Sequence, residues 1–93
     1  MTADELLEIE KYGALFMPPY QVACIMQVDV DLFCFAMQDN TSEVFKAYYK
    51  GFYTSIAELR TTVLAQAKSG SSPAQTIILK QLEETINQLP NHE

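Results

Sequence analysis

The chain has 93 residues, of which 48% are hydrophobic and 11% aromatic, with only three glycines. This composition excludes an intrinsically disordered chain and suffices for one small domain with a single core. The net charge of −6 repels nucleic acid and anionic membranes on average. No apolar run reaches the roughly 18 residues of a membrane-spanning helix, and the N-terminus is acidic where a secretory signal is basic, so we expect a cytoplasmic protein with no membrane partner.

The charge is distributed unevenly along the chain. Residues 46–80 carry five cations and one anion, whereas the segments before and after them are acidic. The cations are Lys46, Lys50, Arg60, Lys68 and Lys80, against Glu58. The charge is therefore asymmetric and not simply acidic.

Two helices are predicted in the N-terminal part. Thr2 and Glu5 form a capping box in front of the first helix, residues 3–16, whose apolar residues follow at helical spacing. The prolines at positions 18 and 19 end it and open a second helix that runs to Met26, because proline has no amide hydrogen to lose in a first turn. The expected buried face of the second helix holds Val22, Ala23, Ile25 and Met26.

A third helix, Val30–Gln38, is predicted to be capped by Asp29 after the short turn at residues 27–29. The pattern around this turn is typical of a helix-turn-helix. A small residue, Ala23, lies where the helices cross, and the apolar side chain of Val28 is expected to fill the inside of the turn. Gln27 stands where glycine is preferred, which predicts a wider or strained turn. A purely structural corner between two helices needs similar residues, so that alternative stays open.

A long helix, Ser42–Lys68, is predicted next, with a box-like start at Asn40 and Glu43 and apolar residues at steps of three and four. Gly51 lies inside it at a cost of up to about 1 kcal/mol relative to alanine. This glycine indicates a close contact with another helix or a slight kink.

The last predicted helix follows Gly70, is capped by Ser72 and stops at Pro90. Its apolar positions should form a face to bury: Ala74, Ile77, Ile78, Leu82, Ile86 and Leu89. The sequence therefore predicts an all-α fold of five helices, with a homeodomain-like helix-turn-helix core followed by a helical hairpin. We expect a single domain, 1–93, with the helix-turn-helix in 1–40 and the hairpin in 41–93.

Nothing in the sequence indicates catalysis, a cofactor or a metal site. Cys24 and Cys34 are ten residues apart without a second cysteine pair, and the only histidine is His92, so zinc-ligand spacing is absent. We expect two reduced core thiols, with a disulfide or a reactive thiol as alternatives. A metalloprotease motif, a phosphate-binding glycine loop and a nucleophile with an activating histidine are also absent, so we do not expect an enzyme.

Three segments, taken in order, resemble the sequence pattern of one protein family. They are "YGALFMPPYQVACIMQVDVDLFCFAMQD", "AYYKGFYTSIAELR" and "LAQAKSGSSPAQTIILKQLEE". Over roughly residues 6–86 the chain resembles the helix-turn-helix region of small terminase subunits from phages and prophages of gut bacteria. The resemblance implies a non-enzymatic, ring-forming homo-oligomer that recognises double-stranded viral DNA in the bacterial host cytoplasm and passes it to the large terminase ATPase during genome packaging.

The long helix is a better candidate for DNA contact than the third helix. The third helix offers one base-reading side chain, Gln38, among acidic and apolar residues, and no cation lies between Lys11 and Lys46. At about 100° per residue, four cations of the long helix fall within about 80° of one another, on a face separate from its apolar stripe. The expected DNA-binding residues are Lys46, Lys50, Arg60, Lys68 and Gln38.

Two other interpretations remain for these surfaces. The third helix is rich in large apolar residues, so Leu32, Phe35 and Met37 could instead form an interaction surface for a partner protein, with no DNA bound. The basic face of the long helix could be solvated, or it could dock the acidic helix ends of a neighbouring subunit.

Overall fold

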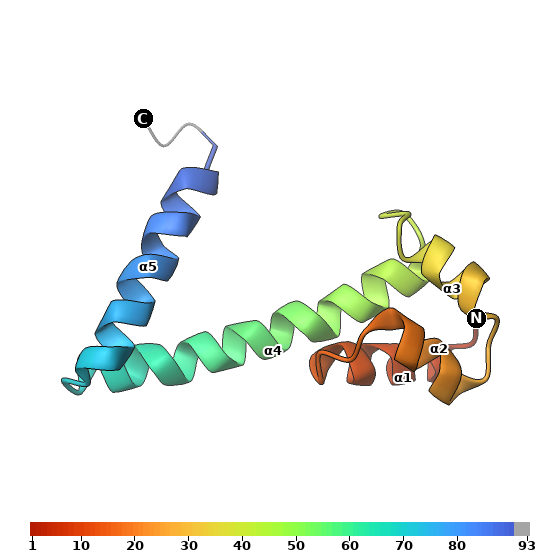
Figure 1. Ribbon diagram of the computed structural model, residues 1–93, viewed down its shortest axis with the longest axis horizontal. Coiled ribbons are helices and arrows are strands. Elements are labelled where there is room, and N and C mark those ends of the chain that lie inside the picture. Colours follow the sequence, from red (N-terminus) through yellow and green to blue (C-terminus); the bar gives the residue numbers. More distant parts are fainter. Residues whose placement is uncertain (91–93) are drawn as a thin grey trace. The chain divides into compact units, whose positions relative to one another are not determined.

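The computed structural model describes residues 1–90, and His92 therefore lies outside the described part. Within these residues the chain is helical and contains no strand, which confirms the all-α fold class (Figure 1). The helices in chain order are α1 (Ala3–Ala14), α2 (Pro19–Met26), α3 (Val30–Ala36), α4 (Glu43–Lys68) and α5 (Ser72–Gln88).

The helices fall into two compact units, Met1–Ile56 and Ala57–Glu93. The sequence pattern predicts one domain whose two parts meet between residues 40 and 41. The division falls inside α4 instead, because the first part of α4 completes the core of the first unit, whereas its last part belongs with α5.

α1 begins with the expected capping box. The Thr2 side chain accepts a hydrogen bond from the Glu5 amide, and the Thr2 amide donates to the Glu5 carboxylate at 3.1 Å. The helix ends at Ala14, two residues earlier than predicted, because Phe16 adopts a left-handed conformation with φ of 61°. The Phe16 ring meets that of Phe52 edge to face at 5.1 Å, and such packing contributes about 0.5–1.5 kcal/mol against the cost of this conformation.

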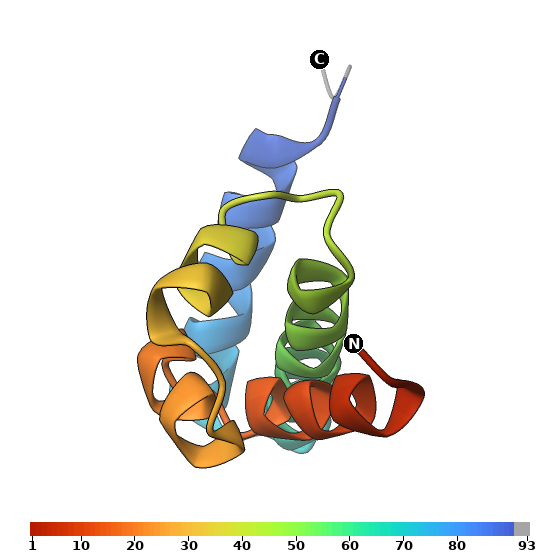
Figure 2. The same ribbon diagram turned by 90° about the vertical axis from the view of Figure 1, so that its right-hand side faces the viewer.

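α2 and α3 pack against each other across the short turn between them (Figure 2). α2 ends at Met26 and is followed by Gln27, whose φ of 58° is left-handed, so the strain expected at this glycine-like position is present. Asp29 caps α3 as predicted, accepting from the Leu32 amide at 2.9 Å. α3 ends at Ala36, two residues before the predicted end.

Two of the predicted helix caps are wrong by one or two positions. Ser42, not Asn40, accepts from an amide in the first turn of α4, that of Phe45 at 3.1 Å. Ser71, not Ser72, caps α5 by accepting from the Ala74 amide at 3.4 Å. In both cases a serine hydroxyl next to the helix reaches the free amide, which is the usual capping geometry.

The hydrophobic core lies in the first unit. Its buried members come from α1 to α4 and are Ile9, Val22, Ala23, Phe33, Met37, Val44 and Tyr48. The two cysteines are not the core thiols that their apolar neighbours predict, because Cys24 is exposed and Cys34 only half-buried. Ile25 is exposed too, so the buried face of α2 is narrower than its composition suggests.

α1 and α4 approach closely at two glycines. A Cβ atom added to Gly13 would collide with the backbone of Tyr48, and one added to Gly51 would collide with the backbone of Glu10. The interpretation of Gly51 as a close helix contact is therefore confirmed. Two hydroxyl groups of α4 satisfy carbonyl groups at the end of α1: Tyr48 donates to Met17 at 2.6 Å and Ser55 to Ala14 at 2.7 Å.

The second unit consists of the end of α4, a turn at Gly70 and α5. Gly70 has a φ of 102°, as expected for the residue that ends α4. Only two small side chains, Ala67 and Ala74, are buried among the described residues of this unit. The predicted buried face of α5 is therefore mostly open, with Leu82 52% exposed and Ile86 exposed as well.

Candidate functional site

The four cations expected to bind DNA all lie on α4 and are accessible to solvent. Lys46 and Lys50 belong to the first unit, one helical turn apart, whereas Arg60 and Lys68 belong to the second. Lys68 lies in the last turn of α4, where a cation also interacts favourably with the negative end of the helix dipole.

Lys50 has an intramolecular partner. Its Nζ lies 3.5 Å from Oε1 of Glu10 in α1, although the Lys50 side chain remains 72% exposed. Exposed ion pairs of this kind are worth about 0–1 kcal/mol, so a phosphate could replace the Glu10 carboxylate at little cost.

Gln38 is exposed and follows the end of α3, so it is accessible but does not project from a helix laid along a groove. The neighbouring side chains are unsuited to DNA. Asp31 and Asp39 are exposed, and Asp29 caps the helix. Gln38 therefore lies next to the Asp39 carboxylate, which repels phosphate.

Two of the three apolar side chains expected to form an interaction surface on α3 are exposed. Leu32 is 71% exposed and Phe35 is 74% exposed, one turn apart on the helix. Met37 does not belong to this surface, which corrects our prediction. Its side chain is 8% exposed and packs in the core, because residue 37 lies one helical turn after the buried Phe33, to whose carbonyl its amide donates at 3.0 Å.

The second unit contains an open groove between the end of α4 and α5, with a volume of about 430 Å³. Its apolar lining comes from Leu64 of α4 and from Ile78 and Leu82 of α5. The complete lining is Arg60, Thr61, Leu64, Ile78, Gln81, Leu82 and Thr85. The Oε1 atom of Gln81 is buried without a hydrogen-bond partner, a situation that costs about 1–3 kcal/mol.

The sequence prediction missed this groove. Periodicity shows that α5 has an apolar face, and Ile78 and Leu82 are assigned to it, but the pattern does not say which element covers that face. A usable signal was nevertheless present. A last helix that pairs with one other helix has no third element to enclose a core, so part of its apolar face must stay open.

The described residues contain neither a recognisable metal-binding cluster nor a helix that could span a membrane. Within residues 1–90 no three histidine, cysteine or acidic side chains are grouped so that they could hold a metal ion. None of the helices in this range is both long and apolar enough to cross a bilayer.

Comparisons with known proteins returned no matching family model, no similar curated protein and no similar solved structure.

Proposed function

We propose that the chain is a non-enzymatic, self-associating DNA-binding protein of the small terminase type. In this role its copies assemble, hold viral double-stranded DNA through phosphate contacts and present it to a large terminase ATPase in the cytoplasm of the bacterial host. The resemblance of residues 6–86 to that family supplies the class of function, and two features of the structure support it.

The open groove of the second unit is the observation that carries this proposal. Two helices cannot enclose a core by themselves, and Leu64, Ile78 and Leu82 remain accessible to a partner. Burying a leucine or isoleucine side chain completely contributes about 1.5–3 kcal/mol, so three such residues give a substantial drive to associate. A second copy is always available at the same concentration and carries the same apolar residues on α4 and α5, which favours a homo-oligomer.

Accessible cations on α4 support the DNA contact. Lys46 and Lys50 in the first unit, and Arg60 and Lys68 in the second, can be reached by phosphate. The corner formed by α2 and α3 is consistent with a helix-turn-helix that acts as a scaffold. Because α3 is acidic, it is unsuited to reading bases, so the DNA contacts are phosphate contacts made by α4. An assembly repeats these cations in every subunit, so weak contacts add up along the DNA.

The mass of the chain in solution tests the proposal. Light scattering over a range of concentrations should give a multiple of the monomer mass. A strict monomer at tens of micromolar contradicts self-association through this chain and leaves the terminase assignment without its main structural support.

A second candidate is a helical protein-interaction module whose helix-turn-helix does not bind DNA. The exposure of Leu32 and Phe35 beside Asp31 favours it, because this surface suits protein better than phosphate. An oligomer that fails to bind duplex DNA even at low salt supports this candidate against the first.

A further inference from the structure

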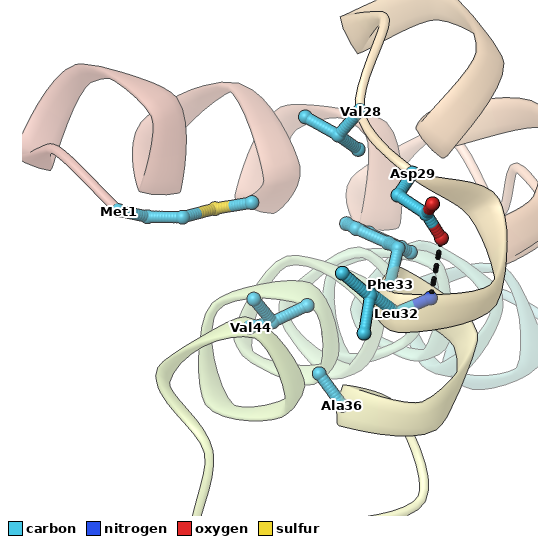
Figure 3. A pocket seen from close by; sticks show the side chains of 7 residues that line it. All are labelled: Met1, Val28, Asp29, Leu32, Phe33, Ala36 and Val44. Carbon is cyan, nitrogen blue, oxygen red and sulfur yellow. Dashed lines mark hydrogen bonds between the residues drawn. The ribbon is translucent and has the colours of Figure 1, made fainter.

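The first unit contains an apolar pocket beside α3, with a volume of about 270 Å³. Leu32, Phe33 and Ala36 form its α3 side, and the side chain of Met1 approaches from the opposite side (Figure 3). The complete lining is Met1, Val28, Asp29, Leu32, Phe33, Ala36 and Val44. This volume is slightly below the usual range of about 300–1,000 Å³ for small-molecule sites, so the pocket suits one or two apolar side chains.

Exposed apolar residues extend the pocket along α3. Phe35 lies one turn from Leu32, and both side chains are more than two-thirds exposed. Together with Asp29, Asp31 and Ala36 they form what we call the α3 face. An exposed leucine and phenylalanine beside an apolar pocket form a continuous surface of the kind found at the centre of protein interfaces.

Three carboxylates lie on α3 or directly beside it in the chain. Asp29 lines the pocket, Asp31 follows it in the first turn of α3, and Asp39 lies just beyond the helix. Hydrogen bonds from the Thr41 hydroxyl and amide, and more weakly the charge of Lys46, hold the pKa of Asp39 below its ordinary value. The first unit contains eight carboxylates against three cationic side chains, Lys11, Lys46 and Lys50, and the N-terminal ammonium, so the field around α3 attracts cations.

We propose that the α3 face binds an amphipathic helix of a partner protein that carries apolar side chains flanked by lysine or arginine. The proposal rests on the second candidate function above, a protein-binding role for α3, and not on DNA binding. The apolar side chains of the partner enter the pocket and cover Leu32 and Phe35, while its cations face Asp29, Asp31 and Asp39. A DNA backbone fits neither the apolar surface nor the sign of the charge.

Fluorescence anisotropy with a synthetic helical peptide tests this inference. The probe is a labelled five-turn peptide with leucine on one face and lysine on the other. Two matched peptides carry glutamate in place of lysine or serine in place of leucine. We expect the leucine–lysine peptide to bind the whole chain, with an affinity that falls as salt is added, and the two matched peptides to bind at least about ten-fold more weakly.

Variants of the chain locate the binding. The double variant Leu32→Ser, Phe35→Ser should bind the leucine–lysine peptide at least about ten-fold more weakly. Both side chains are exposed, so their loss leaves the core intact. Leu7→Ser removes a leucine of α1 that is also largely exposed, and it should leave the affinity for the peptide unchanged. Asp31→Asn should weaken binding and flatten its salt dependence. Helical circular dichroism checks that each variant is folded.

Several results would overturn the inference. Equal binding by the wild type and the Leu32→Ser, Phe35→Ser variant would show that the peptide attaches elsewhere on an acidic surface. An absence of binding at low salt would rule out the stated partner chemistry. A fall in the light-scattering mass of that double variant would mean that a second copy of this chain occupies the α3 face. Duplex DNA binding can succeed or fail without affecting any of these results.

Discussion

Gly51 of α4 lies directly against the backbone of Glu10 in α1, with no room for a side chain between the two helices. A methyl group at position 51 would stand 2.8 Å from the carbonyl carbon of Glu10 and 3.0 Å from the Ala14 amide nitrogen. Because both obstacles are backbone atoms, neither can rotate out of the way. This contact fixes how closely the first helix approaches the long helix.

The Gly51→Ala variant should therefore be destabilised by about 3 kcal/mol, although alanine gains about 1 kcal/mol in helix propensity. Chemical denaturation gives the free energy of unfolding. Gly70→Ala is the matched control, since a Cβ there meets no atom within 4 Å and the cost comes only from its φ of 102°. We expect Gly70→Ala to lower the free energy of unfolding by about 1–2 kcal/mol. A Gly51→Ala variant as stable as the wild type would contradict the close contact.

Tyr48 links α4 to the segment after α1, and it makes the stability of the fold depend on pH in the alkaline range. Its hydroxyl donates to the Met17 carbonyl at 2.6 Å, and burial, followed by the neighbouring Tyr49, raises the pKa of the Tyr48 phenol above its ordinary value of 10.0. Both states keep the proton well below pH 10. As pH rises above 10 the unfolded state loses its proton first, so Tyr48 lowers the free energy of unfolding there.

The Tyr48→Phe variant should be about 1 kcal/mol less stable at pH 8, because the Met17 carbonyl loses its donor. The stability gap between the wild type and this variant should narrow above pH 10, since phenylalanine has no proton to lose. Denaturation curves at the two pH values provide the comparison. A gap that stays constant or widens in alkali would show that the pKa of Tyr48 is not raised in the folded protein.

Leu82 lines the groove of the second unit, and its replacement tests how the chain associates. Leu82→Lys places a charge where a second copy would bury an apolar side chain, so the dissociation constant of the oligomer should rise at least about ten-fold. Thr76→Lys is the control, because residue 76 is exposed on α5 and does not line the groove. Sedimentation or light scattering at several concentrations measures the association of both variants. Equal masses for the two variants would place the oligomer interface elsewhere.

Much of the fold could be predicted because it follows from local chemistry. Thr2 with Glu5 and the carboxylate of Asp29 satisfy amides within three residues, and Pro19 suits the first turn of a helix because it has no amide hydrogen to lose there. Gly51 could also be interpreted correctly, since a glycine inside a long helix needs a reason and a close backbone approach is a common one.

The candidate site was harder to predict because exposure depends on what the rest of the chain covers. Met37 and Phe35 are both large and apolar, yet Met37 lies one turn after the buried Phe33 and is buried with it, whereas Phe35 is exposed. Leu82 lies on a helical apolar face, but within the second unit nothing covers it. Periodicity identifies such a face without specifying its partner.

DNA binding through α4 has its own variant test. Replacing Lys46, Lys50, Arg60 and Lys68 by alanine should weaken duplex binding and reduce its salt dependence, by a slope of about 0.9 for each phosphate that is no longer neutralised. Lys80→Ala on α5 removes one cation that lies outside this group, and it should change neither quantity. An equal effect of Lys80→Ala would indicate a response to net charge alone.

The affinity of the whole chain for duplex DNA, measured as salt is varied, tests the central claim most directly. The proposed function predicts binding by an oligomer at low salt, with the logarithm of the association constant falling linearly as the logarithm of the salt concentration rises. An absence of binding at low salt, or binding that does not weaken as salt is added, would contradict it.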